Sequence, residues 1–247
     1  MKPTTLLASS WALMSGLVGG PAHAADPAHA ADPEAEPRVI SGFHALNRPT
    51  GIAEAGFGWL TLPGAKVCGA QGACKDGDTS FELDAWQLYR QNLRLAFGAG
   101  LLLGLIPTTD APTDDPIGIE RNHSRKYLTL EGTLRYYPYV AEKSEYWIGL
   151  TGGLVVLSDR FQVVDDYDKP LIGPSGVTIR TEGATVGIAF GGAYELSQHW
   201  SVGGSFRFGN WFLPSTPARD PLNDKASVTG RNSVFSLGLN VAYRIGL

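Results

Sequence analysis

The sequence predicts an all-β fold, an eight-stranded antiparallel up-and-down β-barrel that spans a membrane. Two observations carry this prediction: eight segments alternate apolar with small or polar residues, as strands do, and the connections between them are alternately short and long. A third observation concerns the second face of these segments, which holds mainly Gly, Ser, Thr and Ala where a water-facing sheet would hold Lys, Glu and Gln. Small residues suit the crowded centre of an eight-stranded barrel, so we expect the apolar face to meet lipid.

Eight strands follow one another from residue 51 onward. Their expected ranges are 51–62, 80–90, 92–106, 124–138, 145–158, 177–196, 199–212 and 234–247. The range 80–90 is the least well defined, because its apolar residues also suit a helical turn.

The connections between these strands alternate in length. Long loops are expected at 63–79, 107–123, 159–175 and 213–231, and short turns near 91, 140–144 and 196–199. Short turns on one rim and long loops on the other are typical of transmembrane barrels whose turns are periplasmic and whose loops lie outside the cell.

The first residues predict an export signal. Lys2 precedes an apolar run that is too short to cross a bilayer as a helix, and Ala22-His23-Ala24 is a small-x-small cleavage motif. The hexapeptide AHAADP is repeated, so Ala30 offers a second cleavage point. The predicted organisation is a signal peptide at 1–24, a periplasmic linker at 25–50 and the barrel at 51–247.

Two cysteines, Cys68 and Cys74, lie close together in CGAQGAC. In an exported protein this pair predicts a disulfide that closes a small loop. A zinc site would need further ligands, and His44 and His123 are isolated in the sequence. We expect no cofactor, and a formal net charge of -4 argues against binding to nucleic acid.

Charged residues punctuate the small-residue face with both signs. The predicted lumen network consists of Glu54, Glu82, Asp84, Arg94, Glu131, Arg135, Arg207 and Arg244. Buried charges need partners, and arginine can bind a carboxylate with two parallel hydrogen bonds. On the lipid side each arginine would cost about 2–4 kcal/mol at mid-bilayer, which favours the lumen. A soluble, lipocalin-like exported barrel with its charges in water is the alternative.

The last predicted strand is apolar at every second position. These positions are Phe235, Leu237, Leu239, Val241, Tyr243 and Ile245. In this strand, and in aromatic residues near both strand ends, residues 51–247 resemble the small eight-stranded outer-membrane barrels of the Gram-negative cell envelope. The resemblance implies an integral outer-membrane protein whose C-terminal strand is read by the barrel-assembly machinery, although Leu247 stands where that class usually has Phe. It implies no particular activity.

We found no phosphate-binding loop, nucleophile elbow or HExxH motif, which favours a non-enzymatic structural or surface-interaction role. Five cationic residues near the outer rim are expected to contact the phosphates of lipopolysaccharide. They are Arg121, Arg125, Lys126, Arg160 and Arg180.

Two alternatives concern the outer rim and the lumen. His123, Ser124, Ser158 and Asp159 would be neighbours at the rim of a lipid-A-modifying hydrolase or acyltransferase, but HSRKY lacks the His–Ser spacing of the known deacylases. A porin-like diffusion channel does not fit so narrow a lumen, whereas a narrow gated pore stays open as an alternative. The acidic loop 159–175 could attract calcium, although a solvated loop fits its spacing better.

Overall fold

A computed structural model describes residues 49–68, 74–104, 108–110, 121–163, 176–220 and 224–246. The strands are β1 Thr50–Cys68, β2 Cys74–Arg90, β3 Leu95–Gly104, β4 Thr108–Asp110, β5 Arg121–Val140, β6 Ser144–Val163, β7 Gly176–Glu195, β8 Trp200–Phe212 and β9 Arg231–Gly246. The predicted signal peptide, and all but the last two residues of the predicted linker, lie outside the described part of the chain. Among the described residues, no helix has the length and apolarity to cross a membrane.

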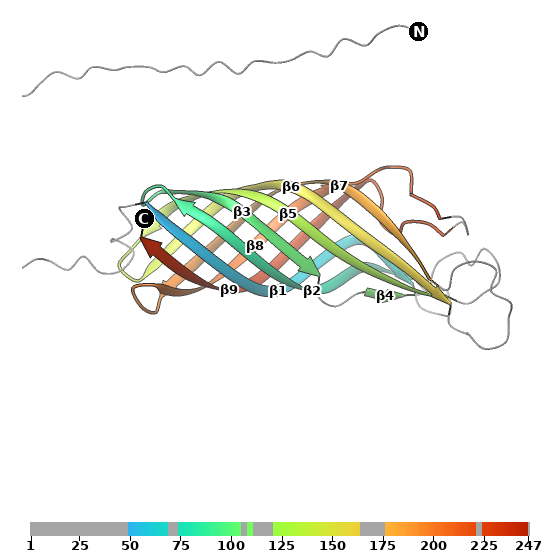
Figure 1. Ribbon diagram of the computed structural model, residues 1–247, viewed down its shortest axis with the longest axis horizontal. Coiled ribbons are helices and arrows are strands. Elements are labelled where there is room, and N and C mark those ends of the chain that lie inside the picture. The colour runs from blue at the N-terminus through green and yellow to red at the C-terminus, as the bar shows by residue number, and fades with distance from the viewer. Residues whose placement is uncertain are drawn as a thin grey trace, which may run out of the picture. The chain divides into compact units, whose positions relative to one another are not determined.

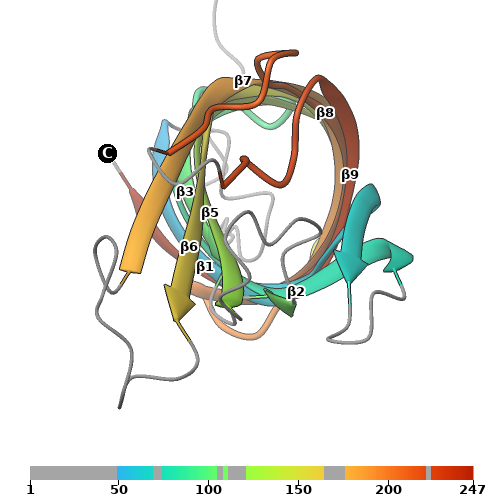
Figure 2. The same ribbon diagram turned by 90° about the vertical axis from the view of Figure 1, so that its right-hand side faces the viewer.

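The strands form one closed antiparallel sheet. Their order is β3-β2-β1-β9-β8-β7-β6-β5-β4, and pairing between β3 and β5 closes the ring. Because β4 also pairs with β5, farther along the same edge, β3 and β4 occupy one position in the wall and the barrel has eight strands. Figure 1 shows the strands tilted around the barrel, and Figure 2 looks along the barrel, so that its strands form a ring. The predicted fold class is confirmed.

Several strands are longer than predicted. β1 reaches Cys68 and β2 begins at Cys74, so most of the expected loop 63–79 is strand. β6 continues to Val163, which removes the first residues of the expected loop 159–175. In the expected loop 107–123, both β4 and the start of β5 are strand. The prediction was wrong at these ends because it ended each strand where the alternation of apolar residues ended. The backbone hydrogen bonds between strands continue beyond that point.

The burial pattern is inverted relative to a soluble barrel. Leu150 and Leu154 are each 61% exposed on the outer surface, whereas Glu82 and Arg135 are 2% and 3% exposed inside. Leaving a large apolar side chain in water forgoes about 1.5–3 kcal/mol of burial, so an outer surface covered with such residues fits lipid and not water. The predicted assignment of the two faces is confirmed, and the lipocalin-like alternative is wrong.

Aromatic side chains lie on the outer surface towards both ends of the strands. Near the short turns, Tyr139 packs on Tyr146 and Trp200 packs on Tyr243, with ring centroids 5.6 and 4.9 Å apart. Trp59, near the other end, packs against Phe81. Aromatic rings at both interfaces are expected for a membrane-spanning barrel, so these rings mark the two limits of its apolar band.

Candidate functional site: the lumen and the outer rim

The middle of the lumen holds two groups of ion pairs. Arg135 of β5 donates from both terminal nitrogens to Glu54 of β1, at 2.9 and 3.1 Å. Arg207 of β8 lies 3.2 Å from both Glu82 of β2 and Glu131 of β5. These contacts join strands from different sides of the barrel, as predicted, so the lumen is cross-linked by charge-assisted hydrogen bonds.

Two further groups complete the middle layer. Ser236 of β9 donates to Glu82 at 2.7 Å, which brings a fifth strand into the network. Asp84 also faces the lumen and is half-buried. A Cβ atom at Gly56 would lie 2.6 Å from its carboxylate, so the glycine provides the space that Asp84 occupies.

The inner end of the lumen, beside the short turns, has its own ion pairs. Arg244 donates to Glu195 at 3.1 Å, and Arg90 to Glu145 at 2.6 Å. The sequence prediction included Arg244 but missed the other three residues, which lie at the ends of predicted strands, because it looked for paired charges at mid-strand. Continuing the alternation inward from Trp86 through Leu88 would have placed Arg90 in the lumen.

Arg94 was predicted to join the lumen network, and this prediction was wrong. It lies in the turn between β2 and β3, where its side chain is exposed. Its guanidinium donates to the backbone carbonyls of Tyr137 and Pro138 at 3.0 and 2.5 Å. The β3 strand begins only at Leu95, so alternation does not yet govern this position.

A small cavity lies in the middle of the lumen. A cavity of about 10 Å³ lies between Glu131, Thr151, Thr185 and Arg207, and it is lined further by Ser236. This is about the volume that one water molecule needs. At this level of the barrel, the described side chains therefore leave room for about one water molecule, as the width of an eight-stranded barrel leads one to expect.

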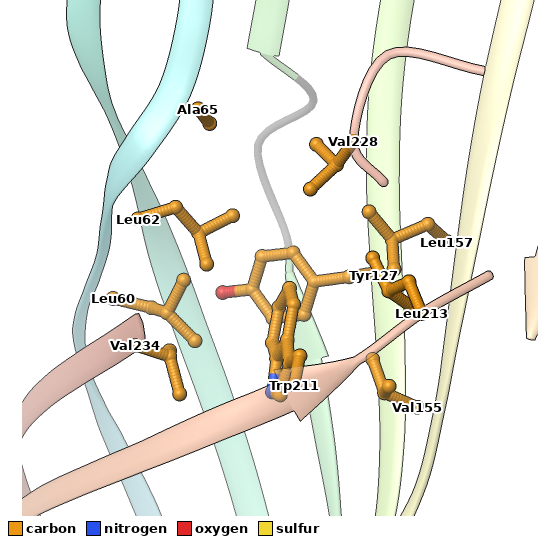
Figure 3. Packing of buried hydrophobic residues seen from close by; sticks show 10 residues of the cluster. All are labelled: Leu60, Leu62, Ala65, Tyr127, Val155, Leu157, Trp211, Leu213, Val228 and Val234. Atoms are coloured by element: carbon orange, nitrogen blue, oxygen red, sulfur yellow. The ribbon is translucent and has the colours of Figure 1, made fainter. Parts of the chain in front are cut away.

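The outer end of the lumen is apolar, which the sequence did not predict. Its cluster consists of Leu60, Leu62, Ala65, Tyr127, Val155, Leu157, Trp211, Leu213, Val228 and Val234. Figure 3 shows Val228 beside Leu157 and Leu213, with Tyr127 and Trp211 in the centre. Leu213 and Val228 belong to the β8–β9 connection, residues 213–230, so this connection contributes to the interior of the barrel.

A polar cluster lies beside this apolar one. The carboxylate of Asp159 accepts hydrogen bonds from His123 Nε2 at 2.8 Å, Ser227 Oγ at 2.5 Å and Ser227 N at 3.1 Å. Arg125 donates to Ser227 Oγ at 2.8 Å and to Asp78 at 3.0 Å. Arg125 is 2% exposed, so its predicted contact with lipopolysaccharide was wrong.

The alternative hydrolase arrangement is not assembled. His123 and Asp159 are buried inside the barrel, whereas Ser124 and Ser158 occupy the next positions of β5 and β6 and belong to the outer face. The serine that does reach Asp159 is Ser227, and it shares that carboxylate with His123 instead of bonding to the imidazole. A Ser–His–Asp relay needs the histidine between the other two groups, and this cluster does not have that order.

Three of the predicted cations form an exposed group on the outer surface, which we call the outer cationic patch: Lys126, Arg160 and Arg180. Lys126 of β5 lies directly across from Ser158 of β6, which lies across from Arg180 of β7. Arg160 follows Ser158 by two residues and so shares its face. The side chain of Arg121 is outside the described part of the chain.

Cys68 and Cys74 are partners in the pairing of β1 with β2. Residues directly opposite each other in an antiparallel pair have Cα atoms about 4.5–5.5 Å apart, which a disulfide can bridge. Their side chains lie outside the described part of the structure, so the disulfide stays a prediction. Asp165, Asp166 and Asp168 of the acidic loop also lie outside the described part of the chain. Among the residues described, no group of three or more His, Cys, Asp and Glu could hold a metal ion.

The Asp159 cluster, which lies beyond the outward apolar residues of β6, predicts a specific pH dependence. Burial alone would raise the pKa of the Asp159 carboxyl, but hydrogen bonds from His123 and Ser227 outweigh it and hold that pKa below its ordinary value. A depressed pKa stabilises the folded state fully above the unfolded value of about 3.9, and the contribution is lost as the pH falls through the folded pKa. Below that pH, Arg125 lies beside a neutral carboxyl, and Asp78 is the other acidic group of the cluster.

We therefore expect residues 224–230 to keep constant protection from hydrogen exchange between pH 7 and about pH 5 and to lose it below about pH 4. Mass spectrometry, corrected for the intrinsic pH dependence of exchange, measures this directly. Protection of the wall segment 148–154 is the internal control and should not change. Loss of protection already between pH 7 and 5 would contradict the assignment to Asp159.

Comparisons with known proteins support the fold only. No family model and no curated protein sequence matches the chain. Among solved structures, a major outer membrane protein from Thermus thermophilus is similar over 80% of this chain and 99% of its own, with a TM-score of 0.52 and 16% identity. Neisserial surface protein A covers 78% of this chain and 96% of its own, with a TM-score of 0.48 and 10% identity. OprG from Pseudomonas aeruginosa covers 84% of this chain and 99% of its own, with a TM-score of 0.42 and 14% identity.

The closed eight-stranded sheet, the apolar outer surface and the charged lumen together define a β-barrel of the outer-membrane class. The Thermus protein, which shares the fold at a TM-score above one half, is itself described as an outer membrane protein. The location that this geometry fits is the bacterial outer membrane, with the outward apolar residues in contact with lipid.

Proposed function

We propose that this protein is a non-enzymatic component of the outer membrane, with a structural and surface-interaction role, and that it is not a diffusion channel. The observation that carries the proposal is the filled lumen. Ion pairs occupy its inner end and its middle, and an apolar cluster fills its outer end. Because little room remains for solute, the parts of the molecule available to partners are its surfaces.

The partner we propose is lipopolysaccharide, bound at the outer cationic patch. Lys126, Arg160 and Arg180 lie beyond the outward apolar residues of their strands, of which Val156 and Ala184 are the nearest on β6 and β7. On β7, the exposed Glu182 lies between Ala184 and Arg180, directly across from Val156. That height places three cations where anionic headgroups begin. Charge-assisted hydrogen bonds to phosphate are strong, and cations beside an anionic surface each contribute about 1 kcal/mol. We also propose that the barrel-assembly machinery reads the alternating apolar residues of β9.

Replacing all three patch residues by alanine is expected to weaken lipopolysaccharide binding about tenfold or more, because three headgroup contacts are lost together. Binding of purified lipopolysaccharide to the detergent-solubilised full chain, measured at two salt concentrations, checks this. The matched control is Arg94→Ala with Lys143→Ala, two exposed cations in the short turns. Equal weakening by patch and control variants would mean that no specific site exists.

Two measurements separate this role from the alternatives. A filled lumen predicts no stepwise conductance in planar bilayers, and regular steps would favour the narrow pore. A non-enzymatic role predicts that lipid A has the same mass spectrum with and without the protein. A defined mass change on deletion would favour the lipid-A-modifying enzyme.

A further inference from the structure

The β8–β9 connection enters the outer mouth of the barrel instead of standing away from it. Asp224, Ala226 and Val228 are all buried, and each alternates with a less buried neighbour. Val228 belongs to the apolar cluster of Figure 3, and Ala226 packs with Phe161 and Ile179 of β6 and β7. In Figure 2, part of this connection lies within the ring of strands.

This inserted part is separate from the hydrogen-bond ladder of the wall. Among the described residues, the backbone bonds that involve the connection are within itself or at its base. At the base, Leu213 N donates to Gly230 O and Gly230 N donates to Pro214 O, at 2.9 and 3.1 Å; within it, Ala226 N donates to Ala218 O at 2.9 Å. Removing residues 224–228 from the mouth would therefore break no pairing between wall strands.

The base has the properties of a hinge. Gly230 has a φ of 68°, in the left-handed region that glycine adopts without strain, and no atom lies within 4 Å of where a Cβ would be. Its two backbone bonds fix the ends of the connection to each other, and hydrogen bonds between Asp220 and Asp224, at 3.2 and 2.8 Å, join its two arms beyond the base. On the other arm of the base, Pro214, Ser215 and Thr216 are exposed.

A polar contact through Ser227 holds the inserted part to the wall. Ser227 donates through both Oγ and N to Asp159 of β6 and accepts from Arg125 of β5 at 2.8 Å. Asp159 is fully buried and Arg125 nearly so. Asp159 is also hydrogen-bonded to His123, and Arg125 to Asp78. These two groups of the wall therefore keep their positions whether or not Ser227 is present.

We propose that residues 224–228 form a lid over the outer end of the lumen, and that the contact of Ser227 with Asp159 and Arg125 is the latch that keeps it closed. When the latch opens, the lid turns about Gly230 and exposes the apolar cluster at Leu157 and Tyr127. The ion pairs deeper in the lumen stay in place. Opening thus uncovers a dead-end vestibule and does not create a channel, so the proposal goes beyond the surface role argued above.

The test is the rate at which a cysteine beneath the lid reacts. In the refolded full chain, Leu157→Cys is treated with a polar maleimide, and the label at residue 157 is quantified by peptide mass spectrometry, which distinguishes it from Cys68 and Cys74. Labelling should be slow with the native latch and about tenfold faster or more with Ser227→Ala, because both side-chain hydrogen bonds of the latch, to Asp159 and from Arg125, are lost. Ser233→Ala, which removes a hydroxyl bonded to Asn210 away from the lid, should leave the rate unchanged.

A second variant tests the motion independently of the latch. Added to Leu157→Cys, the pair Ile179→Cys and Ala226→Cys, which belong to one packed cluster on wall and lid, should form a disulfide that suppresses labelling at residue 157 until it is reduced. Heat-modifiable gel mobility verifies that each variant forms the barrel, so that a change in labelling rate reports on the lid and not on a failure to fold. If Ser227→Ala labels no faster than the parent, the latch is wrong; if the cross-link leaves labelling unchanged, the lid is wrong.

Discussion

Replacing Glu54 by alanine is expected to destabilise the barrel by about 3–5 kcal/mol, because Arg135 then stays charged in the lumen without its carboxylate. Glu54 and Arg135 form a two-bond pair at 2.9 and 3.1 Å, and both side chains are more than nine-tenths buried. The guanidinium also lies 4.0 Å from the centre of the Trp147 ring, which leaves it little freedom to find water. Urea unfolding of the refolded protein in lipid vesicles, followed by gel mobility, measures the loss.

The double variant Glu54→Gln with Arg135→Met is the informative companion. Removing both charges is expected to recover most of the loss, because replacing a buried pair is far less costly than breaking it. Lys143→Ala, which removes an exposed ammonium group in the turn between β5 and β6, is the control and should change stability by less than about 0.5 kcal/mol. A small effect of Glu54→Ala, equal to that of the control, would contradict a structural role for the lumen pairs.

Replacing Leu150 by arginine is expected to cost about 2–4 kcal/mol, because this position faces the middle of the bilayer. Leu150 is 61% exposed on β6, between Ile148 and the small residue Gly152 on the outer face. In a water-soluble barrel the same change at an exposed position would be close to neutral. The same vesicle unfolding experiment measures the cost.

Position dependence makes this prediction specific. Thr178→Arg introduces the same side chain on the same face of the neighbouring strand β7, but beyond the apolar band, next to Arg160. It is expected to have little effect, since the cost of arginine falls to about 0–1 kcal/mol near the interface. Equal costs at both positions would mean that the band between them is not in contact with lipid.

The sequence was sufficient to predict the wall of the barrel wherever lipid constrains it. Each membrane-crossing strand must keep apolar residues on one face, so alternation at Leu150, Thr151 and Gly152 specifies both the strand and its orientation. The same constraint placed Glu54, Arg135 and Arg207 inside, and it also predicted that they would be paired. Which carboxylate pairs with which guanidinium depends on barrel closure, and no local pattern contains that information.

Prediction was less successful beyond the apolar band. There, the outer face no longer meets lipid, so the alternation of apolar and polar residues weakens. The sequence at strand ends such as Val163 therefore looks like that of a loop. At Arg125, by contrast, the alternation continues beyond the apolar band. Arg125 is in step with Tyr127 and Glu131, which both point inward, so counting along β5 would have placed it inside. It was grouped with the outer cations by its nearness in sequence to Lys126.

The β8–β9 connection could not be predicted for a different reason. Its sequence is rich in Pro, Asp and polar residues, the composition of a solvated loop. Only Ala226 and Val228 are apolar in the inserted part, and two small residues give no recognisable pattern. Their burial depends on side chains from strands that are distant in the sequence, among them β1 and β6.

The central claim, that the apolar face of each strand meets lipid while the charged face fills the lumen, is tested most directly by nitroxide scanning of residues 148–155 of β6 in lipid vesicles. Labels at Ile148, Leu150 and Leu154 should be readily accessible to oxygen dissolved in the bilayer, and labels at Thr151 and Val155 should be shielded. The reverse alternation, with oxygen reaching Thr151 and not Leu150, would contradict the orientation on which the account depends.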